Sequence, residues 1–441
     1  MATSISQEPI PDPLFCFQNK SEEALCTRNF TLSMGVAAIP GERMRVLAFL
    51  VLLSAFFLLV GGPTMGQAPQ STPAPSAKEW HFVVSGDSRN CGDFIMPAIA
   101  DGAARHQASF YWHLGDFRAM RAPDQDLQGE LDRSGKIRRL DIDDYHVRAW
   151  EDFVEMQIAP FEKHGIPVFL GIGNHELVPP KDRLQYVERF AKWIGSPAIK
   201  EQRPEDSGSS RPPRTYYHWQ QDGIDFISLD NASHDQFDPE QLRWFNRLLK
   251  QDANDPAVVA VVVGMHKALP DSISNWHSMA ESQEGMRSGR CAYNSLVRLQ
   301  RDSHKRVYVL ASHSHFYMPD IYNTQFWRSS KNAKHTVLPG WIVGTAGAVR
   351  YRLPEHSPSS AKTDVYGYLL ATVNAGGVPG AINFEFKQVL KNKGDGEDFV
   401  SDDVKKMFSR EAQDYCLNGN SDMSPAKVLP EAPEAPCPEL Q

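Results

Sequence analysis

Five short apolar segments of this 441-residue chain run directly into aspartate, asparagine or histidine. In sequence order they are HFVVSGD, YWHLGD, FLGIGNH, VVVGMH and VLASHSH. Apolar runs of this length, rich in β-branched and aromatic residues, are typical of buried strands. In an open α/β sheet, ligands bind beyond the carboxyl ends of the strands. We therefore expect the polar residues to lie together at one edge of a sheet, although they span residues 87 to 315.

Strands and helices alternate along the chain from residue 79, which predicts βαβ units and an α/β sandwich. The clearest helix follows Asp238, an N-cap residue with Pro239 at the first helical position. Leu242, Phe245 and Leu249 then recur at helical spacing. The predicted helices cover 93–105, 143–163, 183–193, 239–251 and 291–302, and the predicted strands cover 81–85, 110–114, 168–172, 216–219, 226–229, 258–263, 307–311, 341–343, 366–373 and 381–386.

The N-terminal region has the pattern of an export signal. Residues 46–60 are apolar apart from Ser54, follow two arginines and precede a Gly-Gly-Pro sequence. A helix of this length spans about 22 Å, less than the hydrocarbon core of about 30 Å, so a secretory signal is favoured over a membrane span. The expected location is therefore the periplasm or the exterior, and the alternative is an uncleaved anchor that tethers the following domain to the membrane outside the cytoplasm. Because Met44 directly precedes the signal, we divide this region into a misassigned or disordered extension (1–43), a signal peptide or anchor (44–66) and a Pro/Ser/Ala linker (67–78).

The charge of the chain is unevenly distributed. Residues 395–441 hold 11 acidic and 4 basic side chains, whereas residues 67–394 hold 38 of each. A neutral body offers no basic surface for nucleic acid, so no sequence-specific nucleic-acid partner is expected. We interpret 79–390 as one domain and 391–441 as an acidic, mostly disordered tail. Four cysteines remain after removal of the signal and allow three disulfide pairings, namely among Cys91, Cys291, Cys416 and Cys437.

The polar residues that follow the apolar segments form a candidate metal-ligand set. Carboxylate, amide and imidazole donors, with no CxxC pair among them, suit Mn, Fe or Zn. One carboxylate can bridge two such ions about 3.5–4 Å apart, and the pair then holds a phosphoryl group and lowers the pKa of bound water. The candidate ligands are Asp87, Asp116, Asn174, His266, His313 and His315.

The motifs GDSR, GD, GNHE, VGMH and SHSH, in this order and spacing, resemble those of the calcineurin-like metallophosphoesterase superfamily over roughly residues 80–390. The resemblance implies the metallo-dependent phosphatase fold, an α/β double β-sandwich flanked by helices. It also implies that a metal-bound hydroxide hydrolyses a small phosphorylated substrate at a centre of two divalent or trivalent transition-metal ions (Fe, Mn or Zn). By motif, Asp87 and His315 match ligands of the first metal, and Asp116 matches the bridging carboxylate. Asn174, His266 and His313 match ligands of the second metal. His175 matches the proton-donating or phosphate-contacting histidine.

The chain departs from the family pattern at the first metal. Many members have the motif D-x-H, whose histidine completes this site, but Arg89 stands at that position. Purple acid phosphatases lack the histidine and instead have a tyrosine three residues after the bridging aspartate, where this chain has Ala119. A guanidinium group binds phosphate oxygens with two parallel hydrogen bonds. We therefore expect Arg89 to bind the substrate phosphate, with a salt bridge at the rim of the site as the alternative.

Two other functions stay open. The substrate could be a phosphodiester or a pyrophosphate, because the predicted pocket loops 118–142, 196–213 and 267–290 contain no motif that selects a substrate. Alternatively, the chain could be a metal-binding protein without catalytic activity, since its first metal site is degraded. Four further arginines could surround an anion but are expected to form a solvated face: Arg287, Arg290, Arg350 and Arg352.

Overall fold

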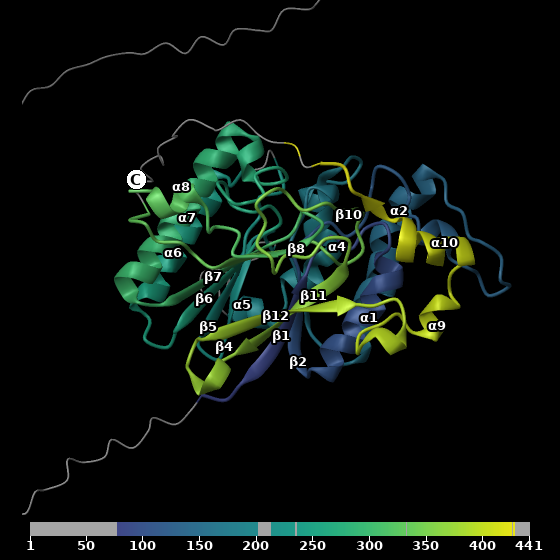
Figure 1. Cartoon of the computed structure of the whole chain (residues 1–441), viewed down its shortest axis with the longest axis horizontal. Coiled ribbons are helices and arrows are strands. Elements are labelled where there is room, and N and C mark those ends of the chain that lie inside the picture. Colours follow the sequence, from purple (N-terminus) through teal and green to yellow (C-terminus); the bar gives the residue numbers. More distant parts are fainter. Residues whose placement is uncertain (1–76, 202–212, 234–235, 332, 426, 428–441) are drawn as a thin grey trace, which may run out of the picture. The chain divides into compact units, whose positions relative to one another are not determined.

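Two β-sheets pack face to face in the computed structural model, which describes residues 77–201, 213–233, 236–331, 333–425 and 427 (Figure 1). The first sheet has five strands in the order β12 (Ile382–Val389), β11 (Tyr366–Val373), β1 (Trp80–Ser85), β2 (Ala108–His113) and β3 (Val168–Leu170). The second has six in the order β4 (Tyr217–Gln221), β5 (Ile224–Ser228), β6 (Ala260–Gly264), β7 (Arg306–Ala311), β9 (Gly340–Val343) and β8 (Tyr317–Pro319).

Aromatic side chains fill the space between the two sheets. Phe82 of β1 meets Phe226 of β5 edge to face, with ring centroids 5.2 Å apart. Phe169 of β3 stacks on Trp219 of β4 at 3.9 Å. Aromatic pairs bury large apolar areas and have preferred relative orientations, so they fix the two sheets against each other.

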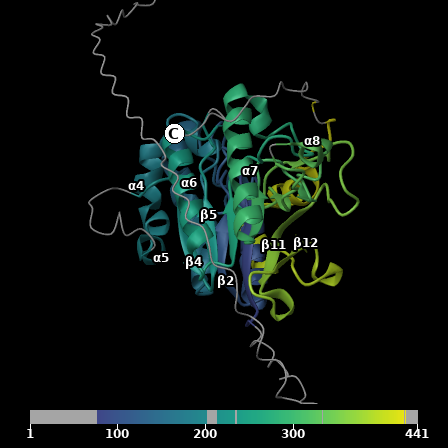
Figure 2. The same cartoon turned by 90° about the vertical axis from the view of Figure 1, so that its left-hand side faces the viewer.

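Helices cover the outer faces of the sandwich. Helix α1 (Gly92–Arg105) lies against the five-stranded sheet, and α6 (Pro239–Asn254) and α7 (Gln283–Ser303) lie on the six-stranded sheet (Figures 1 and 2). As predicted, the Asp238 side chain caps α6 by accepting a hydrogen bond from the Gln241 N–H. The remaining α-helices of this part are α2 (Ile142–Phe153), α3 (Ala159–Lys163), α4 (Arg183–Ile194), α5 (Pro197–Glu201) and α8 (Gln325–Ser329).

The predicted fold class, an α/β double β-sandwich flanked by helices, is confirmed. A strand is present at each of the ten predicted positions, and β11 has the predicted limits. The predicted helix 143–163 is α2 followed by a π-helical turn, Val154–Ile158, and α3. Helix α7 begins at Gln283, eight residues before the predicted start, because Ser282 caps it and the intervening turns are polar. Short elements such as β8 were missed because three residues show no measurable periodicity.

The C-terminal region differs from the prediction of a mostly disordered tail, which is wrong for residues 391–425. This stretch contains α9 (Asp402–Lys405), α10 (Arg410–Asp414) and β13 (Ser421–Asp422), and β13 pairs with β10 (Arg350–Tyr351). A disulfide joins Cys416 to Cys91 at the start of α1, and Phe408 packs on Phe94. Val400, Phe408 and Ala412 are buried against the body of the fold, and an acidic composition does not reveal such isolated anchors. Residues 426 and 428–441 lie outside the described part of the chain.

The predicted extension, signal segment and nearly all of the linker also fall outside the described residues, which begin at Ala77. Among the helices that are described, none combines the length and apolar character required to cross a bilayer. The predicted location is therefore still a prediction.

Candidate metal centre

The predicted site residues converge where the central strands of both sheets end. Asp87 follows β1, and Asp116 follows β2. Asn174 follows β3, His266 follows β6, and His313 follows β7. Strands β1, β2 and β3 are parallel, as are β6 and β7, so their carboxyl ends meet at one rim of the sandwich.

Four of the candidate ligands form a compact group. One ligand atom from each of Asp87, Asp116, His266 and His313 lies within 4.8 Å of the other three, and all four side chains are buried. The Asp116 carboxylate oxygen Oδ1 lies 3.3 Å from His266 Nε2. His313 Nδ1 and Asn174 Oδ1 lie 2.9 and 3.0 Å from the same nitrogen. This spacing suits donor atoms that surround one cation.

The electrostatics of this group also favour a bound cation. His266 Nδ1 lies 3.0 Å from the Leu114 carbonyl oxygen, so this nitrogen donates and Nε2 faces the cluster. Although burial lowers it, the pKa of His266 is raised to about 9 by the carboxylates of Asp116 and Asp87. Buried carboxylates of this kind need a compensating positive charge, and a metal ion supplies one.

The backbone at the candidate ligands is strained. Asp87, Asp116 and His313 have φ angles of 59°, 60° and 64°, in the left-handed region that non-glycine residues rarely adopt. Such conformations cost about 1–3 kcal/mol each and concentrate at functional sites. The turn after β2 also needs Gly115, which has a φ of 97° and lies too close to Gly173 to carry a side chain.

Two buried residues outside the predicted ligand set hold this arrangement in place. Glu176 accepts hydrogen bonds from the backbone N–H groups of Gly173, Asp116 and Phe117 at 2.7, 2.9 and 2.8 Å. It thereby joins the turns that carry Asn174 and Asp116, and burial together with Asp116 raises the pKa of Glu176 to about 7. The fourth letter of the GNHE motif was the available signal.

Asn231 holds the backbone on the other side of the centre. Its side-chain amide donates to the Lys267 carbonyl at 2.7 Å and accepts from the Lys267 N–H at 3.0 Å, directly after His266. Asn231 begins a glycosylation sequon, but its side chain is fully buried. The residue therefore supports the site and does not present an accessible glycan acceptor.

The residues predicted for the first metal are arranged differently. Asp87 Oδ1 and His315 Nε2 lie 3.2 Å apart, but His315 is not part of the compact group. The Arg89 guanidinium lies between these residues and Asp116. Its Nη2 is 3.2 Å from His315 Nε2, and its Nε is 3.7 Å from Asp116 Oδ2. The Tyr351 ring stacks on His315 at 4.1 Å, and Tyr351 also interacts electrostatically with Arg89. Arg89 thus lies within the ligand set, deeper than a salt bridge at the rim.

His175 lies beside the bridging position. Its backbone N–H donates to Asp116 Oδ1 at 2.9 Å, and its ring nitrogen Nδ1 lies 2.5 Å from the Ala119 carbonyl oxygen. A carbonyl can only accept, so Nδ1 carries a proton and Nε2, 3.8 Å from Asp116 Oδ2, faces the centre. Burial and the nearby Arg89 lower the pKa of His175 below its ordinary value. Ala119, which stands where purple acid phosphatases have a tyrosine, contributes only its backbone.

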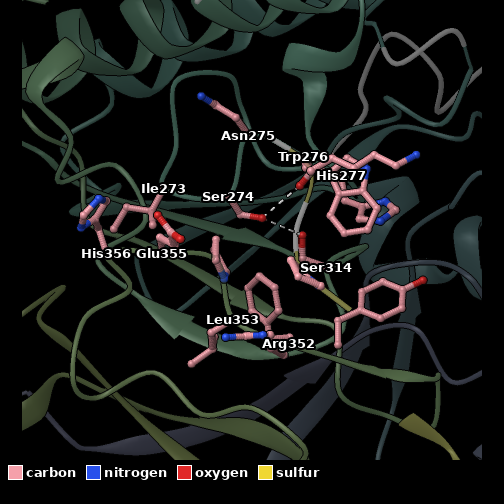
Figure 3. Close-up of a pocket in the computed structure, with 15 residues that line it drawn as sticks. Ile273, Ser274, Asn275, Trp276, His277, Ser314, Arg352, Leu353, Glu355 and His356 are labelled. Atoms are coloured by element: carbon pink, nitrogen blue, oxygen red, sulfur yellow. Dashed lines mark hydrogen bonds between the residues drawn. The ribbon is translucent and has the colours of Figure 1, made fainter. Parts of the chain in front are cut away.

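A cavity of about 590 Å³ adjoins the centre (Figure 3). The segments 273–277 and 351–356 form most of its wall, so the predicted pocket loop 267–290 contributes to it. His277 connects the cavity to the metal ligands, because its Nδ1 lies 3.4 Å from His313 Nε2. Arg352 lines the cavity, but Arg290 and Arg350 pair with Asp271 and Asp364, so the four arginines do not form a ring.

Comparison with known proteins gives matches only among solved structures: no protein-family model and no curated protein matches the chain. The structure of PhoD matches at a TM-score of 0.42 and 13% identity, covering 77% of this chain and 78% of PhoD. A dimetal phosphatase from Danio rerio matches at 0.42 and 10%, covering 71% of this chain and 97% of that one. GAP50, described as the anchor in the inner membrane complex of Plasmodium, matches at 0.38 and 12%, covering 79% and 98%.

All three matches have a TM-score below 0.5 and an identity below 15%, so they do not assign the chain to a family. The structure itself shows an α/β double β-sandwich and a buried Asp/His group that could hold a metal ion. Identities this low carry no information about activity. The functional assignment therefore depends on the side chains of this chain.

Proposed function

We propose that this protein is a metal-dependent phosphoesterase that acts on a small phosphorylated substrate. The observation that carries the proposal is the contact between Asp116 and His266. Their ligand atoms lie 3.3 Å apart although the residues are 150 positions apart in sequence and come from different sheets. Asn174 and His313 complete the set from two further strand ends.

In this proposal, the metal ion and the side chains of the protein have separate roles in hydrolysis. Asp116, Asn174, His266 and His313 would hold a transition-metal ion, which would supply Lewis-acid chemistry toward a phosphoryl group and a water molecule. Arg89, whose side chain is 14% exposed, presents part of its guanidinium to a phosphate oxygen. His175 presents Nε2 to the same space, where this nitrogen exchanges a proton with the oxygen that leaves phosphorus. The cavity beside His277 receives the organic part of the ester.

A second candidate function is metal binding without turnover. The position of the Arg89 guanidinium between His315 and Asp116 favours it, because a positively charged side chain occupies part of the first metal site. Hydrolysis of a phosphodiester or a pyrophosphate is the remaining alternative, and the cavity lining does not select among these substrates.

We also propose export. The signal-like segment 46–60 is its sequence support, and the Cys91–Cys416 disulfide is of the kind that persists in oxidising compartments. An uncleaved signal would instead tether the protein to the membrane. Fractionation of cells that produce the full chain, with N-terminal sequencing of the mature protein, tests export: recovery from the cytoplasm with an intact N-terminus would contradict it.

The activity is tested on the purified full chain loaded with Mn, Fe or Zn. Nitrophenyl phosphate, bis(nitrophenyl) phosphate and pyrophosphate are the substrates, and Asp116→Asn is the variant. Loss of even an outer partner of a metal ligand typically costs 10–100-fold, so we expect kcat/KM of Asp116→Asn to fall by more than about 100-fold. Asp222→Asn, in the exposed turn between β4 and β5, is the matched control and should retain full activity.

The outcomes separate the candidates. Turnover of the monoester that is lost in Asp116→Asn supports the phosphoesterase, and preference for the diester or pyrophosphate identifies the corresponding alternative. Metal binding without turnover of any of the three substrates supports the non-catalytic candidate. A chain that binds no metal ion contradicts both.

A further inference from the structure

We propose that the guanidinium of Arg89 replaces the first metal ion, so that the centre holds a single metal in the half formed by Asp116, Asn174, His266 and His313. The inference goes beyond the proposed function and rests only on its metal centre, because hydrolysis is not needed for it. It concerns how the chain neutralises two buried carboxylates, Asp87 and Asp116.

The ring nitrogen Nε2 of His315 is already engaged by Arg89. Its Nδ1 lies 2.7 Å from the Val349 carbonyl oxygen, so Nδ1 carries the proton and Nε2 holds the only free lone pair of the ring. Arg89 Nη2 lies 3.2 Å from Nε2 and donates to it. A ring nitrogen that accepts this hydrogen bond cannot also bind a metal ion. His315 is therefore engaged by a cation of the chain itself.

The guanidinium of Arg89 also occupies the space beside His315 that a metal ion would need. A metal ion would lie about 2.0–2.1 Å from His315 Nε2, in the direction of that lone pair. The guanidinium already lies in this direction, and its Nε approaches the Asp116 oxygen Oδ2 at 3.7 Å. The Asp87 oxygen Oδ2 accepts the His313 N–H at 2.6 Å, and only Oδ1 faces His315. A second metal ion would have to displace Arg89, and the displaced guanidinium and the ion would then be two adjoining positive charges.

The chain holds Arg89 in this position from several sides. The neighbouring Ser88 N–H donates to the Asp116 carbonyl at 3.0 Å, and the Asn90 N–H donates to Asp124 at 2.5 Å. Cys91 is joined to Cys416, and Tyr351 interacts electrostatically with the guanidinium. Because residues 88, 90 and 91 are each held in place, the segment 88–91 fixes the position of Arg89 in the site.

The test counts metal ions per chain. The full chain is freed of metal with a chelator, reconstituted with excess Mn²⁺, separated from free ion and measured by elemental analysis. Electron paramagnetic resonance distinguishes an isolated Mn²⁺ from an exchange-coupled pair. We expect one ion per wild-type chain with an isolated signal. We expect two ions and a coupled signal in Arg89→His, which places an imidazole where the D-x-H motif has one.

Arg89→Lys should keep one ion, because it preserves the charge, and Arg352→His in the cavity wall is the control for an added histidine. Circular dichroism shows whether each variant is folded. Two ions in the wild-type chain would overturn the inference even if no variant folds, as would one ion in a folded Arg89→His chain. Two ions with turnover would contradict the inference about Arg89 and support the proposed function. One ion without turnover would support the inference about Arg89 and contradict the proposed function.

Discussion

The two halves of the candidate metal centre start from similar ligands and neutralise their carboxylates in different ways. Around Asp116 and His266, the structure gathers the ligand atoms of a compact buried group, to which Asp87 also contributes one oxygen. Around Asp87 and His315, an arginine of the chain enters the ligand set. The difference teaches that a matching motif predicts where donor atoms converge but does not predict how many ions they hold. A single residue, Arg89, decides this.

The largest expected difference between the halves is in metal content. His266→Ala should lower the metal content from about one ion per chain to nearly none, because His266 Nε2 lies at the centre of the compact group. His315→Ala should keep its ion, since His315 lies outside that group. Elemental analysis of both variants measures this contrast. Equal loss of metal in the two variants would show that the halves form one dinuclear centre.

A smaller effect is expected from the residue that supports the compact half. In Glu176→Gln, one of the oxygens that accept the N–H groups of Asp116, Phe117 and Gly173 becomes an amide donor. We expect metal affinity to fall by about 10–100-fold, as is usual for such outer partners, and this is measured by competition with a metal-sensitive dye. The exposed Glu240→Gln on α6 is the control. An unchanged dissociation constant would mean that the turns keep their shape without Glu176.

A third pair of buried carboxyl groups, outside the candidate metal centre, holds a proton in place of a metal or a guanidinium. Asp225 of β5 and Asp252 of α6 influence each other's pKa, with His218 Nδ1 3.0 Å from Asp225 and Lys305 acting on Asp252. Burial raises the pKa of Asp225 to about 8 and that of Asp252 to about 9. Raised carboxyl pKa values mean that the folded chain binds more protons than the unfolded chain, so this stabilisation is lost as the pH rises from about 4 to about 9.

Asp252→Asn removes one of these titrating groups. Relative to the wild type, we expect it to gain about 2–4 kcal/mol of stability between pH 5 and pH 9, after allowance for relaxation of the buried pair. Thermal unfolding at the two pH values measures the change, with Asp222→Asn as the exposed control. If the two variants respond to pH in the same way, the buried pair does not hold a proton.

Much of the fold could be predicted because its elements are locally encoded. The apolar runs that became β1, β2, β6 and β7 are continuous, and α6 has both its cap and its apolar stripe in the sequence. The C-terminal elements could not be predicted, because each is short and depends on one or two anchors such as Cys416 and Phe408. Their partners lie hundreds of residues away, so local periodicity contains no signal for them.

By itself, the sequence determined which residue types stand at the strand ends, and therefore that oxygen and nitrogen donors would gather where strands end; that these strands belong to two packed sheets, and not to one, was not predicted from the strand ends. It also placed Arg89 where a histidine was expected. Only the tertiary structure decided that this guanidinium points inward to His315 and Asp116, and that Glu176 and Asn231 hold the surrounding turns. The physical reason is that the direction of a long charged side chain is set by the buried charges around it. Those charges come together only when the two sheets pack.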